Sequence, residues 1–187
     1  MTRVFGSRKK FLTLIVTALF VSLFAILPAS ASVPPNYVSN GSFEVGNFNG
    51  WTVTGNAFTV TNDTDWGWGG PFNHVGTYHV WGYKNAGDDA TGTLKSTTFY
   101  SYWGKLYVDF LIGGGNDIDN LYVALINNET GEELYRATGE NSETYRRVIW
   151  PIPYGVQFYF KVVDNKTGGW GHINVDDFHG PGETIVP

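Results

Sequence analysis

The spacing of hydrophobic and polar positions along the chain is typical of short β-strands. From residue 36 onward, apolar or alternating runs are separated by Gly, Asn and Asp, and no amphipathic helical pattern extends beyond a turn or two. Nine runs are predicted to be strands, at residues 51–60, 76–81, 91–98, 105–112, 121–127, 133–138, 144–149, 158–164 and 172–178. Nine strands of this length suit two packed sheets. The sequence therefore predicts an all-β fold, a two-sheet β-sandwich.

Two segments fall outside the strand pattern. Residues 61–74 are rich in Trp, Gly and Asp and are predicted to form a long loop, and long structured loops in compact domains are usually functional. Residues 181–187, which include Pro181, Gly182 and Pro187, are expected to find nothing to pack against and to form a flexible tail. The sandwich is accordingly expected to occupy residues 32–180.

The N-terminal segment has the organisation of a secretory signal peptide, residues 1–31. Basic residues at positions 3, 8, 9 and 10 precede an apolar run at 11–27 and small residues at 29–31. We expect cleavage after Ala31 and a secreted, extracellular mature protein. The alternative is an uncleaved anchor, because the apolar run approaches the ~20 residues that a membrane span needs. No later segment has that length and hydrophobicity, so the mature form is expected to have no membrane partner.

Charge and cysteine content narrow the function classes. Cleavage removes four of the 12 basic residues and none of the 17 acidic ones, which leaves 156 residues with a net charge of −9. That charge argues against nucleic acid or anionic lipid as a partner. A chain of this length suits one domain. The absence of cysteine excludes disulfides, thiolate zinc sites and cysteine nucleophiles.

Aromatic residues make up 17% of the chain, and several of the seven tryptophans stand beside glycine. Sugar rings present apolar C–H faces that stack on aromatic planes, while their hydroxyl groups need polar partners at the rim. Trp51, Tyr107 and Trp150 lie in predicted strands and are interpreted as core residues. For Trp66 and Trp68, in the predicted loop, surface recognition and local packing are equally open.

Two polar segments could supply such partners. Residues 140–147 place acids and bases around one turn. In one interpretation the arginine and carboxylate groups bind sugar hydroxyl groups, and in the other they form only surface ion pairs. Arg146 and Arg147 are adjacent in a strand and face opposite ways. Residues 164–174 form the densest polar and aromatic run, in which glycines let the backbone turn around Trp170, and His172 is a candidate to bind a hydroxyl group.

Signatures of catalysis are absent from the sequence. The four histidines lack the spacing of a catalytic zinc site, and the chain has no nucleophile elbow, phosphate-binding loop or dinucleotide fingerprint. A glycosidase needs two opposed carboxyl groups, and no motif identifies such a pair. The sequence predicts a protein that is not an enzyme, without excluding one.

Carboxylates near the two ends of the domain form a candidate metal site. Residues 40–44 open the domain and residues 175–178 close it, so Glu44 and Asp176 are expected to lie near each other. Two carboxylates with backbone carbonyls meet the demand of Ca²⁺ for six to eight oxygen ligands. In the alternative interpretation Glu44 caps a turn and Asp176 is a solvated charge at a strand end.

Several of these residues resemble one family. The similar parts are residues 92–96, 111–117, 137–139 with Glu143, Arg146 and Arg147, and the long run 163–177. They resemble carbohydrate-binding module family 66, the galactose-binding-like jelly-roll module appended to levanases and related fructan hydrolases. The similarity extends from about residue 40 to residue 178, and the run 163–177 is its most particular part.

The resemblance implies a jelly-roll sandwich that is stabilised by calcium and binds a polysaccharide or oligosaccharide, in particular fructosyl units, without catalysis. It assigns six residues to the sugar site: Asn116, Glu143, Arg146, Asp164, Trp170 and His172. It makes Glu44 and Asp176 the calcium carboxylates.

Three functional hypotheses follow from the sequence. The first is a secreted, lectin-like module that binds levan-type fructans or another neutral polysaccharide. The second is a structural matrix or cell-surface protein that self-associates through exposed aromatic residues. The third is a small glycan-active hydrolase or lyase.

Overall fold

The computed structural model describes residues 1, 35, 37–102 and 104–183. Contacts divide the chain into residues 1–32 and residues 33–187, and the fold described below belongs to the second unit. The predicted signal peptide lies outside the described residues, apart from Met1. In the described part of the chain, no helix is long and apolar enough to cross a membrane.

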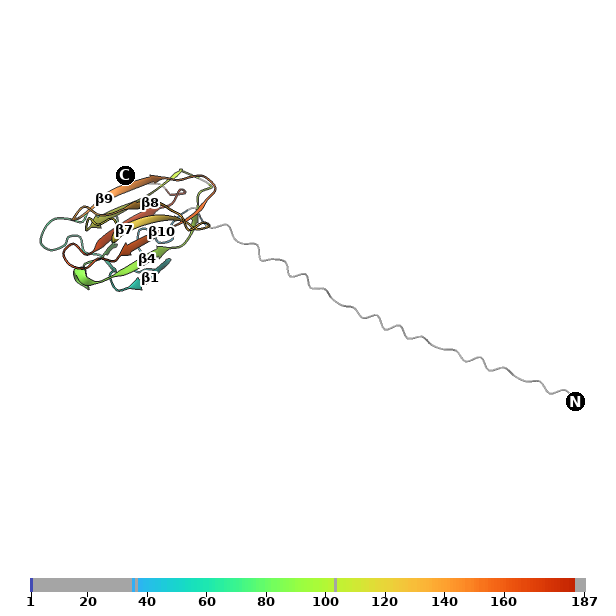
Figure 1. The fold of residues 1–187 in the computed structure, drawn as a ribbon, viewed down its shortest axis with the longest axis horizontal. Helices are drawn as coiled ribbons and strands as arrows, with labels where there is room; N and C mark the ends of the chain where they lie inside the picture. Colours follow the sequence, from blue (N-terminus) through green and yellow to red (C-terminus); the bar gives the residue numbers. More distant parts are fainter. Residues whose placement is uncertain (2–34, 36, 103, 184–187) are drawn as a thin grey trace. The chain divides into compact units, whose positions relative to one another are not determined.

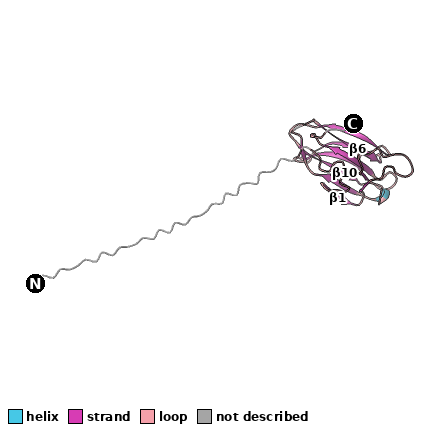
Figure 2. Ribbon diagram, turned by 180° about the vertical axis from the view of Figure 1, so that it is seen from behind, coloured by secondary structure: helices cyan, strands magenta, loops and turns pink. Residues whose placement is uncertain are grey.

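The fold is a β-sandwich of two antiparallel sheets, as the strand pattern predicts (Figure 1). The six-stranded sheet has the order β1 (Trp51–Gly55), β4 (Gly92–Ser96), β10 (Gln157–Asp164), β7 (Leu121–Asn127) and β8 (Glu133–Ala137), with β5 (Phe99–Tyr100) also paired to β10. The five-stranded sheet has the order β2 (Thr59–Thr61), β3 (His79–Trp81), β11 (Ile173–His179), β6 (Tyr107–Gly114) and β9 (Ser142–Pro151). One 3₁₀ helix, η1 (Gly87–Asp89), is the sole helix among these residues (Figure 2).

The main core lies between the two sheets. Strand side chains alternate between faces, so Ile173 and Val175 of β11 and Phe160 and Val162 of β10 all point inward and are fully buried. The Phe160 ring packs against Phe178, with their centroids 4.9 Å apart. Burial of such side chains supplies most of the folding free energy, at about 1.5–3 kcal/mol for each large one.

The predicted strand at residues 51–60 is two strands, one in each sheet. β1 and β2 are separated by a turn at Gly55, whose φ is +72°. A Cβ at Gly55 would lie 2.1 Å from the carbonyl oxygen of Thr91, so only glycine fits. The short strand β5 is also absent from the prediction, and the other strands match predicted runs to within a few residues.

A second hydrophobic cluster covers the outer face of the five-stranded sheet. Its buried members are Phe72, Trp81, Leu111 and Tyr145, with Trp66 and Tyr83 packed against them. The predicted loop at residues 61–74 lies over this face, because its residues Phe72 and Trp66 pack in the cluster. The amide of Tyr145 also donates to the carbonyl of Phe72 at 2.8 Å. The loop is therefore held on the sheet by its own core.

The two ends of the domain lie together. The amide of Phe178 donates to the carbonyl of Gly41 at 3.0 Å, which places the first turn beside the end of β11. The expectation of a free tail from residue 181 does not hold for residues 181–183. The carbonyl of Pro181 accepts from the amide of Lys105, and Glu183 accepts from the amide of Val38. Residues 184–187 lie outside the described part.

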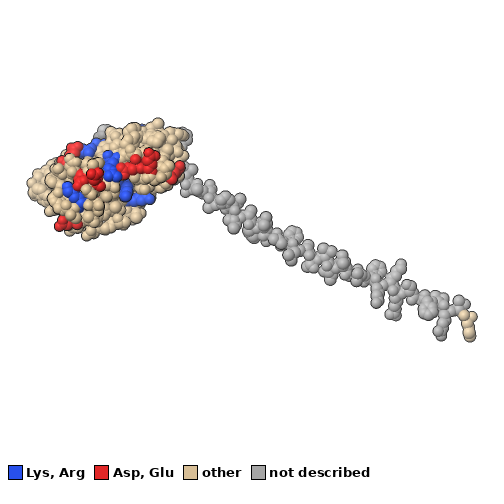
Figure 3. All heavy atoms as spheres, in the orientation of Figure 1, with Lys and Arg blue, Asp and Glu red and all other residues tan. Residues whose placement is uncertain are grey.

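Charged side chains gather on the other sheet. Figure 3 shows Lys and Arg intermixed with Asp and Glu over the exposed face of the six-stranded sheet. Arg136 and Glu133 of β8 pair there, and the ammonium group of Lys95 of β4 lies 4.0 Å from the centre of the Tyr159 ring. Neither sign forms a continuous patch on this face.

Candidate functional site

A hollow of about 270 Å³ opens at one end of the five-stranded sheet, and we call it the His172 hollow. Its lining residues are Trp68, Tyr83, Asp88, Glu143, Gly169, Trp170 and His172. They come from the loop over the sheet, from η1 and the segment before it, from β9, and from the turn that precedes β11. The hollow thus joins parts of the chain that are remote in sequence.

His172 is fixed between two carboxylates at the base of this hollow. Its Nδ1 lies 2.6 Å from Oδ1 of Asp88, and its Nε2 lies 3.1 Å from Oε1 of Glu143. Burial lowers the pKa of His172, but hydrogen bonds and charges from Glu143 and Asp88 outweigh it and raise that pKa above its ordinary value. Both ring nitrogens are donors in this arrangement, so His172 has no lone pair for a metal or a substrate proton.

The Glu143 carboxylate extends the network to the centre of the sheet. Its Oε2 accepts from Nδ2 of Asn174 at 2.6 Å, and Oδ1 of Asn174 accepts from the amide of Gly82 at 2.9 Å. Glu143 and Asn174 are both almost inaccessible to solvent. All polar side-chain atoms of His172, Glu143 and Asn174 have a partner in this network, which fixes the positions of His172 and Glu143 relative to each other.

Aromatic rings form the rim of the hollow. Trp170 is 38% exposed and Trp68 is 67% exposed, both large values for tryptophan. The Trp68 ring lies 5.8 Å from Tyr83, which lies 5.4 Å from His172. Of the two loop tryptophans, Trp68 is thus available to a ligand, whereas Trp66 is half-buried with its ring 5.6 Å from Phe72.

A strained turn presents Trp170. Its φ is +57°, a left-handed conformation that costs a side-chain-bearing residue about 1 kcal/mol or more. The turn rests on Gly115, where a Cβ would lie 2.0 Å from the carbonyl oxygen of Trp170. The Gly-rich end of β6 is therefore needed for close approach of the two backbones.

The structure brings together three of the six predicted sugar ligands: Glu143, Trp170 and His172. Arg146 lines a separate hollow and pairs with Glu140, its Nε lying 2.9 Å from Oε1. Asn116 lies outside the lining of the His172 hollow, and its backbone amide donates to Oδ1 of Asn141 at 2.8 Å.

Asp164 lies at the end of β10 and lines a different hollow. The side chain is almost fully buried, and the carboxyl oxygens make no well-aligned hydrogen bond. Burial raises the pKa of Asp164 to about 7, although the backbone amides of Lys166 and Ile173 and the charge of His172 oppose the rise. Asp164 is thus a buried acid with a raised pKa that lies outside the lining of the His172 hollow.

Two residues of the network are absent from the sequence prediction. Asp88 belongs to η1, and Asn174 lies within the predicted polar run without an assigned role. A pair of acids in a short turn, such as Asp88 and Asp89, carries no periodic signal. Asn174 does carry a clear periodic signal, because a polar residue between Ile173 and Val175 in a strand must face away from the main core.

The two predicted metal ligands lie beside the same segment of backbone. Glu44 accepts from the amides of Thr77 and Tyr78, and Oδ2 of Asp176 accepts from the amide of Val75, each at 2.9 Å. Burial raises the pKa of Asp176 well above its ordinary range, and the charges of Asp177 and Glu44 add to the rise. Within the described ranges, no group of three His, Cys, Asp or Glu side chains could hold a metal.

Arg147 lies on the outer face of the sheet, away from the His172 hollow. It forms ion pairs with Asp109 and Asp177. Nδ1 of His179 also lies 2.9 Å from Oδ1 of Asp109. Burial lowers the pKa of His179, but its hydrogen bonds to Asp109 and Asp177 outweigh burial and raise that pKa to about 9. This cluster is an internal ion network that ties β6, β9 and β11 together.

Comparison with known proteins gives a fold likeness and one distant relative. No family model matches the chain. The sequence is 28% identical over 182 residues to the candidate glycosyl hydrolase ecdE of Aspergillus rugulosus. The alignment covers 76% of this chain, and the chain spans a quarter of that relative's length.

Among solved structures, the carbohydrate-binding module TmCBM61, in complex with β-1,4-galactotriose, superposes with a TM-score of 0.52 and 21% identity. The match covers 77% of this chain and 96% of that one. A family 35 carbohydrate-binding module from Clostridium thermocellum matches with a TM-score of 0.41, 10% identity and coverage of 71% and 92% of the two chains. The likeness to TmCBM61 is one of fold, the β-sandwich.

Proposed function

We propose that this protein is a secreted carbohydrate-binding module that holds a neutral polysaccharide or oligosaccharide in the His172 hollow without cleaving it. The observation that carries the proposal is the satisfied network of Asp88, His172, Glu143 and Asn174 beneath two exposed indole rings. The carbohydrate-binding module named in the fold likeness supports the same class of function.

The chemistry of the hollow suits a sugar ring. Trp170 and Trp68 offer apolar planes for the C–H faces of the ring, and Asp88 offers carboxylate oxygens that accept from hydroxyl groups. A prepositioned network lets a ligand bind without paying for its ordering. The lining carboxylates favour hydroxyl donors and repel anions, so we propose a neutral sugar.

Two observations guide the choice of sugar. The resemblance of residues 163–177 to family 66 modules supports a levan-type fructan. The galactotriose complex of the similar TmCBM61 supports a β-galactan. A glycan array that carries levan, inulin, β-1,4-galactan and uronic-acid polymers tests the proposal. We expect retention by a neutral glycan, and retention by none of them, or by the uronic-acid polymers alone, would contradict it.

Catalysis is the second candidate function, favoured by the likeness to ecdE. A glycosidase needs two carboxyl groups on opposite sides of the scissile bond. In the His172 hollow, Asp88 and Glu143 instead bind the two nitrogens of one imidazole ring. Long incubation with the retained glycan distinguishes the functions: release of reducing sugar that Asp88→Asn abolishes would support the enzyme.

We further propose that Ca²⁺ binds beside Glu44 and Asp176. The proximity of two carboxylates, one of them fully buried, is the observation that favours a cation there. Backbone carbonyls of the adjoining turn would have to complete the oxygen ligands. The ion would neutralise the charges and hold the first turn to the end of β11.

A further inference from the structure

The loop over the five-stranded sheet arranges its two tryptophans differently. A Cβ at Gly69 would lie 2.0 Å from Nε1 of Trp66, so the loop backbone packs directly on that indole ring. Trp68 lies two residues after Trp66 and is 67% exposed. The Trp-Gly-Trp-Gly-Gly sequence thus fixes one ring within the loop and presents the other to solvent.

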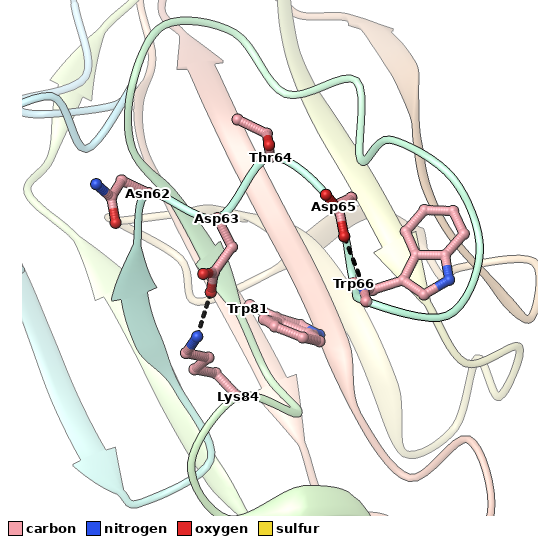
Figure 4. Close-up of a pocket in the computed structure, with 8 residues that line it drawn as sticks. Asn62, Asp63, Thr64, Asp65, Trp66, Trp81 and Lys84 are labelled. Atoms are coloured by element: carbon pink, nitrogen blue, oxygen red, sulfur yellow. Dashed lines mark hydrogen bonds and ion pairs between the residues drawn. The ribbon is translucent and has the colours of Figure 1, made fainter.

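A second hollow, of about 460 Å³, lies beside the fixed ring, and we call it the Trp66 hollow. Trp66 and Trp81 contribute its aromatic surface, and Asp63, Asp65 and Lys84 contribute charged groups. In the view of Figure 4, Trp81 lies between Trp66 and the ion pair of Lys84 with Asp63. The size falls in the range of small-ligand sites.

The groups of the Trp66 hollow are those that bind a sugar ring. Indole planes suit its C–H faces, and Asp65 keeps carboxylate lone pairs free while Oδ1 accepts from the amide of Gly67 at 2.8 Å. Pairing of Lys84 with Asp63 leaves little net charge to attract an ionic ligand. Nε1 of Trp81 has no acceptor among the described residues and is inaccessible to solvent in this structure.

Trp68 connects the two hollows. Its side chain lines the His172 hollow, and its ring lies 6.5 Å from that of Trp81, which lines the Trp66 hollow. We propose that the Trp66 hollow is a second sugar subsite, and that one glycan chain runs from the His172 hollow across Trp68 into it. This inference rests on the proposed function of the His172 hollow and adds that the ligand is a chain of several units.

Binding to an oligosaccharide series tests the second subsite. The probe is a set of fructo-oligosaccharides and β-1,4-galacto-oligosaccharides of one to six units, titrated calorimetrically into the protein. Lys84→Ala removes the ammonium group from the Trp66 hollow, and Asn62→Trp places a large side chain in its lining. Lys95→Ala, on the opposite sheet, is the matched control. Trp170→Ala reports on the His172 hollow alone.

For the wild type we expect affinity to rise with chain length by about threefold to tenfold beyond the shortest bound sugar, the effect of one further ring stacked on an aromatic plane. Lys84→Ala and Asn62→Trp should lose this gain and keep affinity for the shortest sugar, and Lys95→Ala should keep both. Lys84→Ala and Asn62→Trp variants with the same length dependence as the wild type and Lys95→Ala would overturn the second subsite while leaving the proposed function intact. Absence of binding by the wild type would overturn both.

Discussion

The imidazole ring of His172 stacks on the indole ring of Trp170, with centroids 5.7 Å apart and 26° between the planes. The pair joins a buried polar network to an exposed aromatic surface. Because the same ring is held by Asp88 and Glu143, the orientation of the exposed indole depends on hydrogen bonds beneath it. Stability and binding are therefore coupled at this position.

Substitution of His172 tests that coupling. His172→Ala leaves the carboxylate of Glu143 buried without its charged partner, which costs about 3–5 kcal/mol in comparable cases. We expect a loss of that order in the free energy of unfolding, measured by urea denaturation, together with weaker glycan binding. Glu143→Gln combined with His172→Ala removes the unpaired charge, so the double variant should regain part of the stability. A double variant less stable than His172→Ala would contradict the network.

Gly115→Ala tests the backbone contact that supports Trp170. The added Cβ would lie 2.0 Å from a carbonyl oxygen, and overpacking of this kind costs about 1–3 kcal/mol. Gly169→Ala is the control, since nothing lies within 4 Å of its added Cβ. Thermal unfolding should show a clear decrease in Tm for Gly115→Ala and little change for Gly169→Ala. Similar melting of the two variants would mean that the turn is not held there.

Asp164 predicts a characteristic dependence of stability on pH. Its pKa in the folded protein is about 7, above the unfolded value near 3.8, so the unfolded state releases this proton first as pH rises. The contribution of Asp164 to stability is therefore lost progressively between about pH 4 and pH 7. Asp164→Asn should remove this decrease, which urea titrations at several pH values would measure. An unchanged slope in the variant would contradict the raised pKa.

Chelation tests the calcium proposal. An ion that binds only the folded state stabilises it by about 2.7 kcal/mol at a hundredfold excess over its dissociation constant. We expect EDTA to lower the Tm, added Ca²⁺ to restore it, and Glu44→Gln to abolish the response. Glu133→Gln, on β8, is the control and should respond as the wild type does. A Tm unmoved by EDTA would leave Glu44 and Asp176 as caps for the backbone of residues 75–78.

Sequence reasoning located the strands better than the site. β10 alternates between half-buried and buried positions over its first six residues, and β7 is an apolar run that ends at Asn127, so the limits of both follow from the side-chain pattern. The turn at Gly55 depends on the carbonyl of Thr91, a contact distant in sequence that no local pattern encodes.

The same limit applies to the candidate site residues. The resemblance to family 66 modules assigns Glu143 and His172 to the sugar site, and the structure places both in one hollow. Asp164 is also predicted to contact the sugar, but its side chain at the end of β10 is buried in the protein. Arg146 is predicted to contact the sugar as well, but its guanidinium group pairs with Glu140. Which side of a strand end faces a hollow depends on how the sheets pack, and spacing does not specify this.

Calorimetric titration of the wild type and Trp170→Ala with levan and with β-1,4-galactan measures whether the His172 hollow binds a sugar. We expect one of these neutral glycans to bind the wild type and Trp170→Ala to weaken that binding about tenfold, with a fall in Tm that leaves the protein folded at the temperature of the titration. Tyr154→Ala, which removes another exposed ring, should bind as the wild type does. Binding that is unaffected by Trp170→Ala would contradict a sugar site in the His172 hollow.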